Sequence, residues 1–318
     1  VSALMGARAA MKSWPTHIAR ISRLERMAKT DGGKLPVNLK FCGAHTGRWS
    51  GSDGVNLQNM GSRGHELVNA VREVIVAPAG HILAIADCSQ IEARVLAWIA
   101  GQWGLVAKFA NNEEIYCGFA SKVLGYQVRK PQKSGGIPEI EARMGWARNS
   151  IGKIGILGCG YGMGARKAES YAQGAIDFAT AEKIVETYRA ENPAITKFWK
   201  DIEKAFIYTT KYRQPCNLPR GLGFRSLDDC DLIITLPNSR ELKYHNVRVK
   251  HEDMAWNDTA EIYNDQEHKW EYTWGGSLTE NVVQAISRDV LAEGLLRIEE
   301  RGYHVAMHCH DETIVVCP

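Results

Sequence analysis

The stretch HILAIADCSQIEAR, residues 81–94, changes its hydrophobic pattern at its centre. Residues 81–86 form a short apolar run, which predicts a buried strand. From residue 90 to residue 100 the apolar side chains recur at helical spacing, which predicts a helix. Asp87 therefore lies where a strand ends and a helix begins. A carboxylate at this position can cap the helix or bind a hard metal ion, and the stretch alone leaves both interpretations open.

A second acidic site follows in HVAMHCHDETIVV, residues 304–316, which predicts a strand, a tight turn and another strand. Asp311 and Glu312 fall at the tip of this hairpin, where acidic residues commonly serve only to form the turn. Two carboxylates contributed by separate elements can instead hold two Mg²⁺ ions. His308, His310 and Asp311 also fit the HxHxD pattern of a metallohydrolase. That pattern needs further histidine ligands downstream, and none follows in this sequence.

Residues 148–164, RNSIGKIGILGCGYGMG, return to helical spacing. Asn149, Lys153, Leu157 and Tyr161 are four residues apart, so we expect them along one face of a helix. A lysine, an apolar side chain and a tyrosine on one face can contact a triphosphate, a base and a template strand in turn. The alternatives are a solvated lysine and a core tyrosine. The glycines do not match GxGxxG, because position 163 is Met and no strand precedes them.

A loop rich in Gly, Ser and Asn, HTGRWSGSDGVNLQNM, occupies residues 45–60. Arg48 is followed there by Asn56, Gln58 and Asn59. Side chains of these types donate hydrogen bonds to phosphates and to the minor-groove edges of bases. The same composition is ordinary for a surface loop, so a DNA contact is a hypothesis at this point.

The rest of the chain mixes helices and strands without regular alternation. We expect two helices within residues 180–211, interrupted at Asn192 and Pro193, and strands and turns across residues 214–274. Ser277 and Glu280 have the form of a capping box, which predicts that a long helix begins at Ser277. This order favours an α+β fold with an antiparallel sheet over a doubly wound one.

Composition places the chain among soluble globular proteins, with 45% hydrophobic and 24% charged residues. The formal net charge is only +3, but residues 122–171 carry nine basic residues against three acidic ones, which suits phosphate binding. The eight cysteines include no CxxC pair, so we expect reduced thiols and neither a zinc site nor a disulfide framework. No apolar stretch approaches the ~18 residues of a membrane span.

Taken together, the ordered motifs TGRWS…NLQNM, DCSQIEAR, K…GYGMG and HDE resemble the family A DNA polymerases, the DNA polymerase I type. The segment GGSLTENVVQAISRD, residues 275–289, resembles the tailed-phage branch of that family. The resemblance implies a right-hand polymerase with an antiparallel palm sheet, mainly helical fingers and a thumb that is mostly missing. It implies the following division: a thumb remnant or connector in 1–35, palm in 36–107, fingers in 108–235, and the second palm part, truncated after the HDE hairpin, in 236–318.

The resemblance also implies an activity, the transfer of dNMP from dNTP to a primer 3′-hydroxyl, in the cytoplasm of the host if the protein is phage-encoded. Asp87, Asp311 and the backbone carbonyl of Cys88 would hold two Mg²⁺ ions, with Mn²⁺ as a possible substitute, and Glu312 would support the site. Glu92 would exclude a ribose 2′-hydroxyl, and Lys153 would contact the phosphates and protonate the leaving pyrophosphate. The nucleotide-binding residues it implies are Gln90, Glu92, Arg148, Lys153, Leu157 and Tyr161. The residues it implies for primer–template DNA are Arg48, Asn56, Gln58, Asn59, Gln284 and His310.

Several positions depart from the family pattern. Cys88 replaces a tyrosine, Leu157 replaces an aromatic residue, and Asn149 stands where an arginine is usual, with Arg148 one position earlier. These departures concern substrate handling, while both metal-binding aspartates are present. The alternatives are an HxHxD metallohydrolase and a non-catalytic DNA-binding fragment. A single-subunit RNA polymerase would not be expected to carry the SQIE motif with Glu92.

Overall fold

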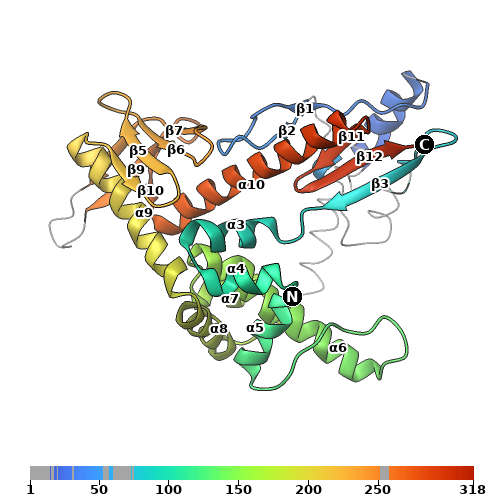
Figure 1. Cartoon of the computed structure of the whole chain (residues 1–318), viewed down its shortest axis with the longest axis horizontal. Helices are drawn as coiled ribbons and strands as arrows, with labels where there is room; N and C mark the ends of the chain where they lie inside the picture. Colours follow the sequence, from blue (N-terminus) through green and yellow to red (C-terminus); the bar gives the residue numbers. More distant parts are fainter. Residues whose placement is uncertain are drawn as a thin grey trace. The chain divides into compact units, whose positions relative to one another are not determined.

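The computed structural model describes residues 15, 18–19, 21–30, 32–52, 57–59, 73, 75–250 and 258–318 (Figure 1). The chain forms two compact units. The first comprises Val1–Ser89 with Arg288–Pro318, and the second comprises Gln90–Ser287. We describe each unit by itself. The division into palm and fingers stays a prediction, because its boundaries came from the family resemblance.

The first unit is built on a three-stranded antiparallel sheet in the order β11–β12–β3. Strands β11 (His304–Cys309) and β12 (Glu312–Cys317) form a hairpin, and β3 (Ile82–Asp87) pairs with β12 along its whole length (Figure 1). The predicted strand before Asp87 and the predicted hairpin are both confirmed. The predicted burial of that strand is wrong, because β3 lies at the edge of the sheet and five of its six residues are exposed. The central strand β12 thereby joins two stretches that are far apart in the sequence.

Smaller elements complete the first unit. Strands β1 (Leu39–Lys40) and β2 (Ser50–Gly51) pair with each other, η1 (Leu57–Asn59) is a short 3-10 turn, and residues 21–30 are helical. Leu24 and Leu57 form a small buried cluster, against which Met307 of β11 packs. This contact ties the 45–60 loop to the hairpin.

The second unit begins with helices that surround one hydrophobic core. Their bounds are α3 (Ile91–Ala100), α4 (Trp103–Ala110), α5 (Ile115–Leu124), α6 (Pro138–Trp146), the π-helix η2 (Ala147–Gly158), the 3-10 turn η3 (Cys159–Tyr161), α7 (Ala165–Tyr171), α8 (Phe178–Glu191) and α9 (Pro193–Tyr212). The predicted break between two helices at Asn192 is confirmed, since Pro193 takes the first position of α9, where its missing N–H costs no helical bond.

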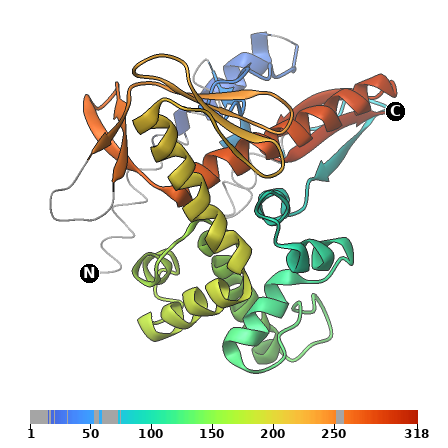
Figure 2. The same cartoon turned by 60° about the vertical axis from the view of Figure 1, so that its left-hand side comes forward.

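Two antiparallel sheets follow α9. The first contains β4 (Cys216–Leu218), β5 (Leu222–Ser226), β6 (Leu232–Thr235) and β7 (Glu241–Tyr244) in that order. The second has the order β10–β9–β8 and contains β8 (Val247–Lys250), β9 (Thr259–Asn264) and β10 (Lys269–Thr273). Helix α9 packs against strands of both sheets and runs beside them in both views (Figures 1 and 2). Helices and antiparallel sheets together confirm the predicted α+β class.

The long helix α10 (Gly275–Glu300) starts earlier than its sequence predicts. Ser277 was expected to cap it, but the helix begins at Gly275, so Ser277 occupies the third helical position. There its hydroxyl accepts a hydrogen bond from the Trp274 N–H at 3.2 Å and donates one to the Trp274 carbonyl at 2.8 Å. The capping-box prediction is therefore wrong in its register, since the serine bonds back to the residue before the helix.

No helix in the described part of the chain is long and apolar enough to cross a membrane.

Candidate active site

Three acidic residues meet at one end of the sheet in the first unit. Asp87 is the last residue of β3, and its direct partner across the ladder is Glu312, the first residue of β12. The N–H of Cys88 donates a hydrogen bond to the carbonyl oxygen of Asp311 at 3.0 Å. This bond extends the pairing of strands β3 and β12 by one residue. Asp87, Asp311 and Glu312, which were expected to be neighbours, therefore come together.

The turn of the hairpin consists of His310 and Asp311. His310 has a φ of 56°, in the left-handed region that non-glycine residues visit uncommonly. Glu312 already belongs to β12, so the tip is one residue nearer the N-terminus than predicted. Since directly opposite residues share a face of a sheet, Asp87 and Glu312 present their side chains on the same face.

These carboxyl groups repel one another. Burial, followed by the nearby charges of Asp311 and Glu312, raises the pKa of Asp87 above its ordinary value. Burial and the same kind of charge also raise the pKa of the Cys88 thiol, so this cysteine stays protonated at neutral pH. Because these carboxylates repel one another, a bound cation would stabilise their ionised forms.

The donors of this site fit a hard divalent cation. Carboxylate oxygens of Asp87 and Asp311 and the carbonyl oxygen of Cys88 are the ligand types that Mg²⁺ accepts. Among the described residues, no three side chains of His, Cys, Asp or Glu converge into a complete metal cluster. Coordination at these aspartates would therefore be completed by backbone, water or substrate oxygens, as is usual for Mg²⁺.

His310 is held by the neighbouring loop. The guanidinium of Arg48 donates to Nδ1 of His310 at 3.1 Å. Burial and the Arg48 charge lower the pKa of His310, although Asp311 acts in the opposite direction. The imidazole is consequently neutral near pH 7, with its proton on the other nitrogen. Arg48 and His310, both expected to contact DNA, are neighbours in the first unit.

The loop residues after Arg48 are described in part. The backbone carbonyl of Gln58 accepts a hydrogen bond from Sγ of Cys309 at 3.2 Å, which fastens η1 to the hairpin. Asn56 lies outside the described residues, and so does the side chain of Asn59. Their expected DNA contacts stay predictions.

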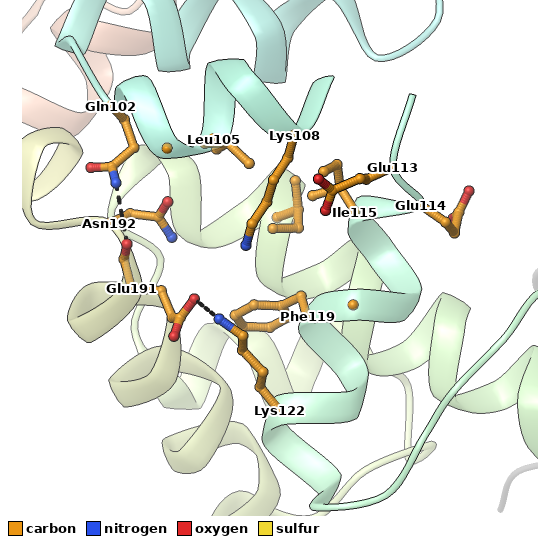
Figure 3. Close-up of a pocket in the computed structure, with 13 residues that line it drawn as sticks. Gln102, Leu105, Lys108, Glu113, Glu114, Ile115, Phe119, Lys122, Glu191 and Asn192 are labelled. Carbon is orange, nitrogen blue, oxygen red and sulfur yellow. Dashed lines mark hydrogen bonds and ion pairs between the residues drawn. The ribbon is translucent and has the colours of Figure 1, made fainter. Parts of the chain in front are cut away.

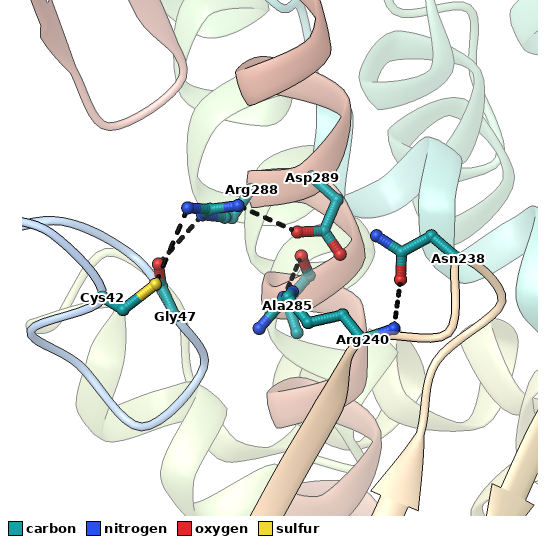
Figure 4. A network of polar contacts seen from close by, with 7 residues as sticks. All are labelled: Cys42, Gly47, Asn238, Arg240, Ala285, Arg288 and Asp289. Atoms are coloured by element: carbon teal, nitrogen blue, oxygen red, sulfur yellow. Dashed lines mark hydrogen bonds and ion pairs between the residues drawn. The ribbon is translucent and has the colours of Figure 1, made fainter.

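Arg288 is a residue of this unit that sequence reasoning missed (Figure 4). It donates to the carbonyl oxygen of Gly47 at 3.0 Å, and its guanidinium lies 4.3 Å from the ring centroid of Trp49 and 3.2 Å from Oδ1 of Asp289. His308 packs edge-on against the same tryptophan, with centroids 4.5 Å apart. The sequence signal that could have identified it is Trp49 beside Arg48, since an aromatic ring attracts a guanidinium.

The HxHxD interpretation does not fit this geometry. His308 is opposite Thr313 in the ladder, whereas Asp87 and Glu312 are opposite each other, so His308 points to the other face of the sheet. It is buried at 7% exposure, and its pKa is lowered by burial and by Arg288. The structure therefore does not support a metallohydrolase site at these residues.

In the second unit, η2 carries Asn149, Lys153 and Leu157 of the predicted series, while Tyr161 falls in the following turn η3. Asn149 and Leu157 are exposed and Lys153 is half-buried, whereas most of the residues between them are buried. Leu157 has 42% of its surface exposed, which is high for a leucine in the middle of a helix. The face carrying these residues is thus available to a ligand. Its backbone is π-helical. This geometry is rare in proteins, and where it occurs it is often at a functional site.

Glycines let η2 approach α5 closely. A Cβ on Gly152 would lie 2.3 Å from the carbonyl oxygen of Tyr116, and one on Gly155 would lie 2.1 Å from the ring of Phe119. Both distances are too short for any real side chain. The buried side of η2 is therefore defined by glycine contacts, and this fixes the orientation of the opposite, exposed side.

Tyr161 and Glu92 are joined directly. The Tyr161 hydroxyl donates to Oε2 of Glu92 at 3.2 Å. Burial, followed by the charge and hydrogen bond of Glu92, raises the pKa of Tyr161 well above its ordinary value, so the tyrosine acts as a donor. Tyr161 packs against the hydrophobic core, as one interpretation of the sequence expected. Its hydroxyl also contacts Glu92, another residue expected in the site. Gln90 lies directly before α3 in the left-handed region, with a φ of 56°.

The start of α3 excludes one of the two interpretations of Asp87. The cap position of this helix belongs to Gln90, and the helix begins at Ile91. Asp87 therefore does not cap the helix, and its metal-binding role stays a prediction.

Other expected residues have partners within their own unit. The Arg148 guanidinium donates to Oε1 of Glu114 at 2.9 Å and lies over the ring of Tyr116 at 5.1 Å. Gln284 donates to Oε1 of Glu280, one helical turn earlier, at 3.2 Å. Their roles toward nucleotide and DNA stay predictions.

Much of the basic segment 122–171 is neutralised internally. Lys122 pairs with Glu191, Lys130 pairs with Glu114 at 3.0 Å, and Arg129 pairs with Glu141 at 2.5 Å. The Arg129 hydrogen bond, with one from the Gln132 N–H, lowers the pKa of Glu141 to about 2. These pairs leave less positive charge for phosphates than the composition suggests.

A cavity of about 330 Å³ opens among α4, α5 and the end of α8 (Figure 3). Its floor includes Leu105 and Phe119, and the ion pair of Lys122 with Glu191 lies at its edge. None of the residues expected to bind nucleotide or DNA lines it.

Comparisons with known proteins agree with this arrangement. The family model for "DNA polymerase family A" matches residues 3–220. The chain is 30% identical over 349 residues to the "DNA polymerase" of Bacillus phage SP02, an alignment that covers 95% of this chain and 52% of that protein. It is 41% identical over 96 residues to "DNA polymerase I" of Caldicellulosiruptor bescii, covering 30% of this chain and 11% of that protein. It thus spans about half of the phage relative.

The fold also resembles a solved polymerase structure. The "POL domain of Pol1 from M. smegmatis complex with DNA primer-template and dNTP" superposes with a TM-score of 0.64 at 19% identity, covering 96% of this chain and 45% of that one. None of these matches supports the metallohydrolase or the non-catalytic alternative. The chain belongs to DNA polymerase family A.

Proposed function

We infer that the protein to which this chain belongs synthesises DNA on a template. It would join the primer 3′-oxygen to the α-phosphorus of a dNTP, break the α–β phosphate linkage and release pyrophosphate. The observation that carries this proposal is the backbone pairing that brings Asp87, Asp311 and Glu312 to one end of the sheet, where the charges of Asp311 and Glu312 help raise the pKa of Asp87. Relatives that match the chain are named DNA polymerases, which supports the same conclusion.

Asp87, Asp311 and the Cys88 carbonyl would hold the two divalent cations of this reaction, Mg²⁺ or as a substitute Mn²⁺. Bound there, the cations supply Lewis-acid chemistry, namely charge neutralisation at the phosphates and a lower pKa for the attacking hydroxyl. Glu312 shares the face of Asp87 and would add negative charge and hydrogen-bond acceptors beside the two ligands.

The exposed face of η2 would bind the incoming nucleotide. Lys153 would contact the triphosphate and donate a proton to the leaving pyrophosphate. Leu157, one turn later, would contact the base or sugar without an aromatic stacking surface. Glu92, fixed by the Tyr161 hydroxyl at 3.2 Å, would occupy the place of a ribose 2′-hydroxyl and so exclude ribonucleotides. Gln90 and Arg148 would complete this set.

Primer–template DNA would lie against the 45–60 loop and the hairpin tip. Arg48 would neutralise a backbone phosphate, and neutral His310 would donate from its free nitrogen. Gln58 and Gln284 would contact the duplex or primer end. Residues 36–107 and 236–318 would form the palm and residues 108–235 the fingers, in a protein that works in the cytoplasm, which is that of the host if the protein is phage-encoded.

Template-directed synthesis has a direct test. The chain, alone and within its longer protein, is incubated with Mg²⁺ and four primer–templates that differ only in the templating base. The proposal expects each template to direct addition of its complementary dNTP. Addition without regard to the template, or no addition by the longer protein, would contradict the proposed function.

A further inference from the structure

Helix α9 carries a basic and aromatic stripe outside the expected active site. We call the set Lys200, Lys204, Tyr208, Lys211 and Tyr212 the α9 stripe. All five residues are exposed, Tyr208 by 44% and Tyr212 by 55%. At roughly 100° per residue they fall within an arc of about 120° and extend over about 18 Å of helix. They therefore form one continuous strip.

The opposite side of α9 is buried in the hydrophobic core. Its buried residues are Ile195, Phe198, Trp199, Ile202, Ala205, Phe206, Thr209 and Thr210. Because the buried residues fix the rotation of the helix about its axis, the α9 stripe faces solvent. Figures 1 and 2 show α9 running beside β5 and β9.

The charge balance of the stripe is positive. Two acidic residues lie along it, and each forms an ion pair with a lysine. Asp201 pairs with Lys197 at 2.5 Å, and Asp258 pairs with Lys211 at 2.6 Å. Within the described ranges of the chain, Lys200 and Lys204 make no ion pair. Their charges are consequently available to an anionic partner, in contrast to much of the paired basic segment 122–171.

The tyrosines show which anion the stripe fits. The rings of Tyr208 and Tyr212 are 5.1 Å apart and inclined by 50°, and the Lys211 ammonium lies 5.7 Å from the Tyr212 centroid. A solvated helix face needs no large aromatic side chains, and the binding of duplex phosphates by charged and hydrogen-bonding groups needs no stacking surface. Exposed rings interleaved with lysines provide stacking for unpaired bases together with charge for their phosphates.

We propose that the α9 stripe binds single-stranded DNA, its lysines contacting phosphates while Tyr208 and Tyr212 stack with bases. This inference rests on the proposed function only in taking DNA as the nucleic acid. The surface would hold an unpaired strand on the second unit, independently of the carboxylates that perform the chemistry.

Equilibrium binding of a fluorescent oligodeoxythymidylate to the whole chain tests the proposal. Tyr208→Ala with Tyr212→Ala should weaken binding about tenfold or more, since each stacked base contributes about 1–3 kcal/mol. Tyr208→Phe with Tyr212→Phe keeps the rings and should retain the affinity. Lys200→Gln with Lys204→Gln should reduce the slope of log K against log salt by about 1.4, at about 0.7 per phosphate contact.

Matched controls use exposed residues of the same unit. Lys183→Gln with Lys243→Gln removes the same charge outside the basic segment 122–171, and Tyr171→Ala removes one exposed ring; both should leave binding unchanged. Stripe variants must keep the wild-type circular dichroism and must extend a primer with a short overhang. Unchanged oligonucleotide binding by such variants would overturn the proposal, and so would an equal loss on blunt duplex DNA. Failure of the wild type to extend primers would instead defeat the proposed function and leave the binding result standing.

Discussion

Replacing Gly152 by alanine should weaken the contact between η2 and α5. The new Cβ would lie 2.3 Å from the Tyr116 carbonyl oxygen and 2.8 Å from its carbonyl carbon. Both are backbone atoms, so no side chain can rotate away and one of the helices has to move. Overpacking of this kind costs about 1–3 kcal/mol. The higher helix propensity of alanine returns about 1 kcal/mol at most.

The expected net effect is a loss of about 1–2 kcal/mol in the free energy of unfolding. For a domain the size of the second unit this lowers the melting temperature by roughly 2–8 °C. Thermal unfolding followed by circular dichroism measures it. Gly118→Ala on the facing helix α5 is the matched control, because no atom lies within 4 Å of its Cβ position. That variant should be as stable as the wild type or more so. A Gly152→Ala protein as stable as Gly118→Ala would refute the packing argument.

Three further predictions concern the carboxylates, the gate and the paired arginine. Because the pKa of Asp87 is raised, the folded protein keeps a proton that the unfolded chain has lost, and stability falls as the pH rises above the ordinary value of 3.8. Near pH 7 and without divalent ions, Asp87→Asn should therefore have a higher melting temperature than the wild type. Mg²⁺ should raise the melting temperature of the wild type more than that of Asp87→Asn. An equal rise in both proteins would argue against a metal at Asp87. Glu92→Ala should raise the incorporation of ribonucleotides relative to deoxynucleotides in primer extension, and an unchanged ratio would remove its gating role. Arg148→Ala should lower the melting temperature and leave the KM for dNTP nearly unchanged, because its guanidinium is paired with Glu114. Lys153→Ala should raise the KM for dNTP and lower kcat, because it removes both the phosphate contact and the proton donor; a rise in KM for Arg148→Ala as large as that for Lys153→Ala would instead make Arg148 a nucleotide ligand.

The sequence predicted the sheet of the first unit because its signals are local. An apolar run that stops at Asp87 and a hairpin that turns at Asp311 each identify their own strand, and the family motif supplies the pairing between them. The break at Pro193 was predictable for the same reason, since proline removes a donor wherever it stands.

Other features depend on contacts that no local pattern contains. Ser277 matched a capping box, yet Gly275 already begins the helix, where a Cβ would lie 1.9 Å from the Trp199 carbonyl oxygen. This close packing requires glycine at position 275, a contact with a distant residue that no local capping pattern contains. Likewise, Arg148 has Glu114 as a partner only because α5 and η2 pack together. Charge counted along a sequence cannot show which lysines and arginines will be neutralised in this way.

The central claim is that Asp87 and Asp311 together hold the catalytic cations. Single-turnover incorporation of one complementary dNMP, with Mg²⁺ and a saturating amount of primer–template, tests it most directly when Asp311→Asn is compared with the wild type. The account predicts a rate lower by about three orders of magnitude or more, as for loss of a group acting mainly in the transition state, with the Kd for DNA nearly unchanged. Incorporation by Asp311→Asn at the wild-type rate would contradict it.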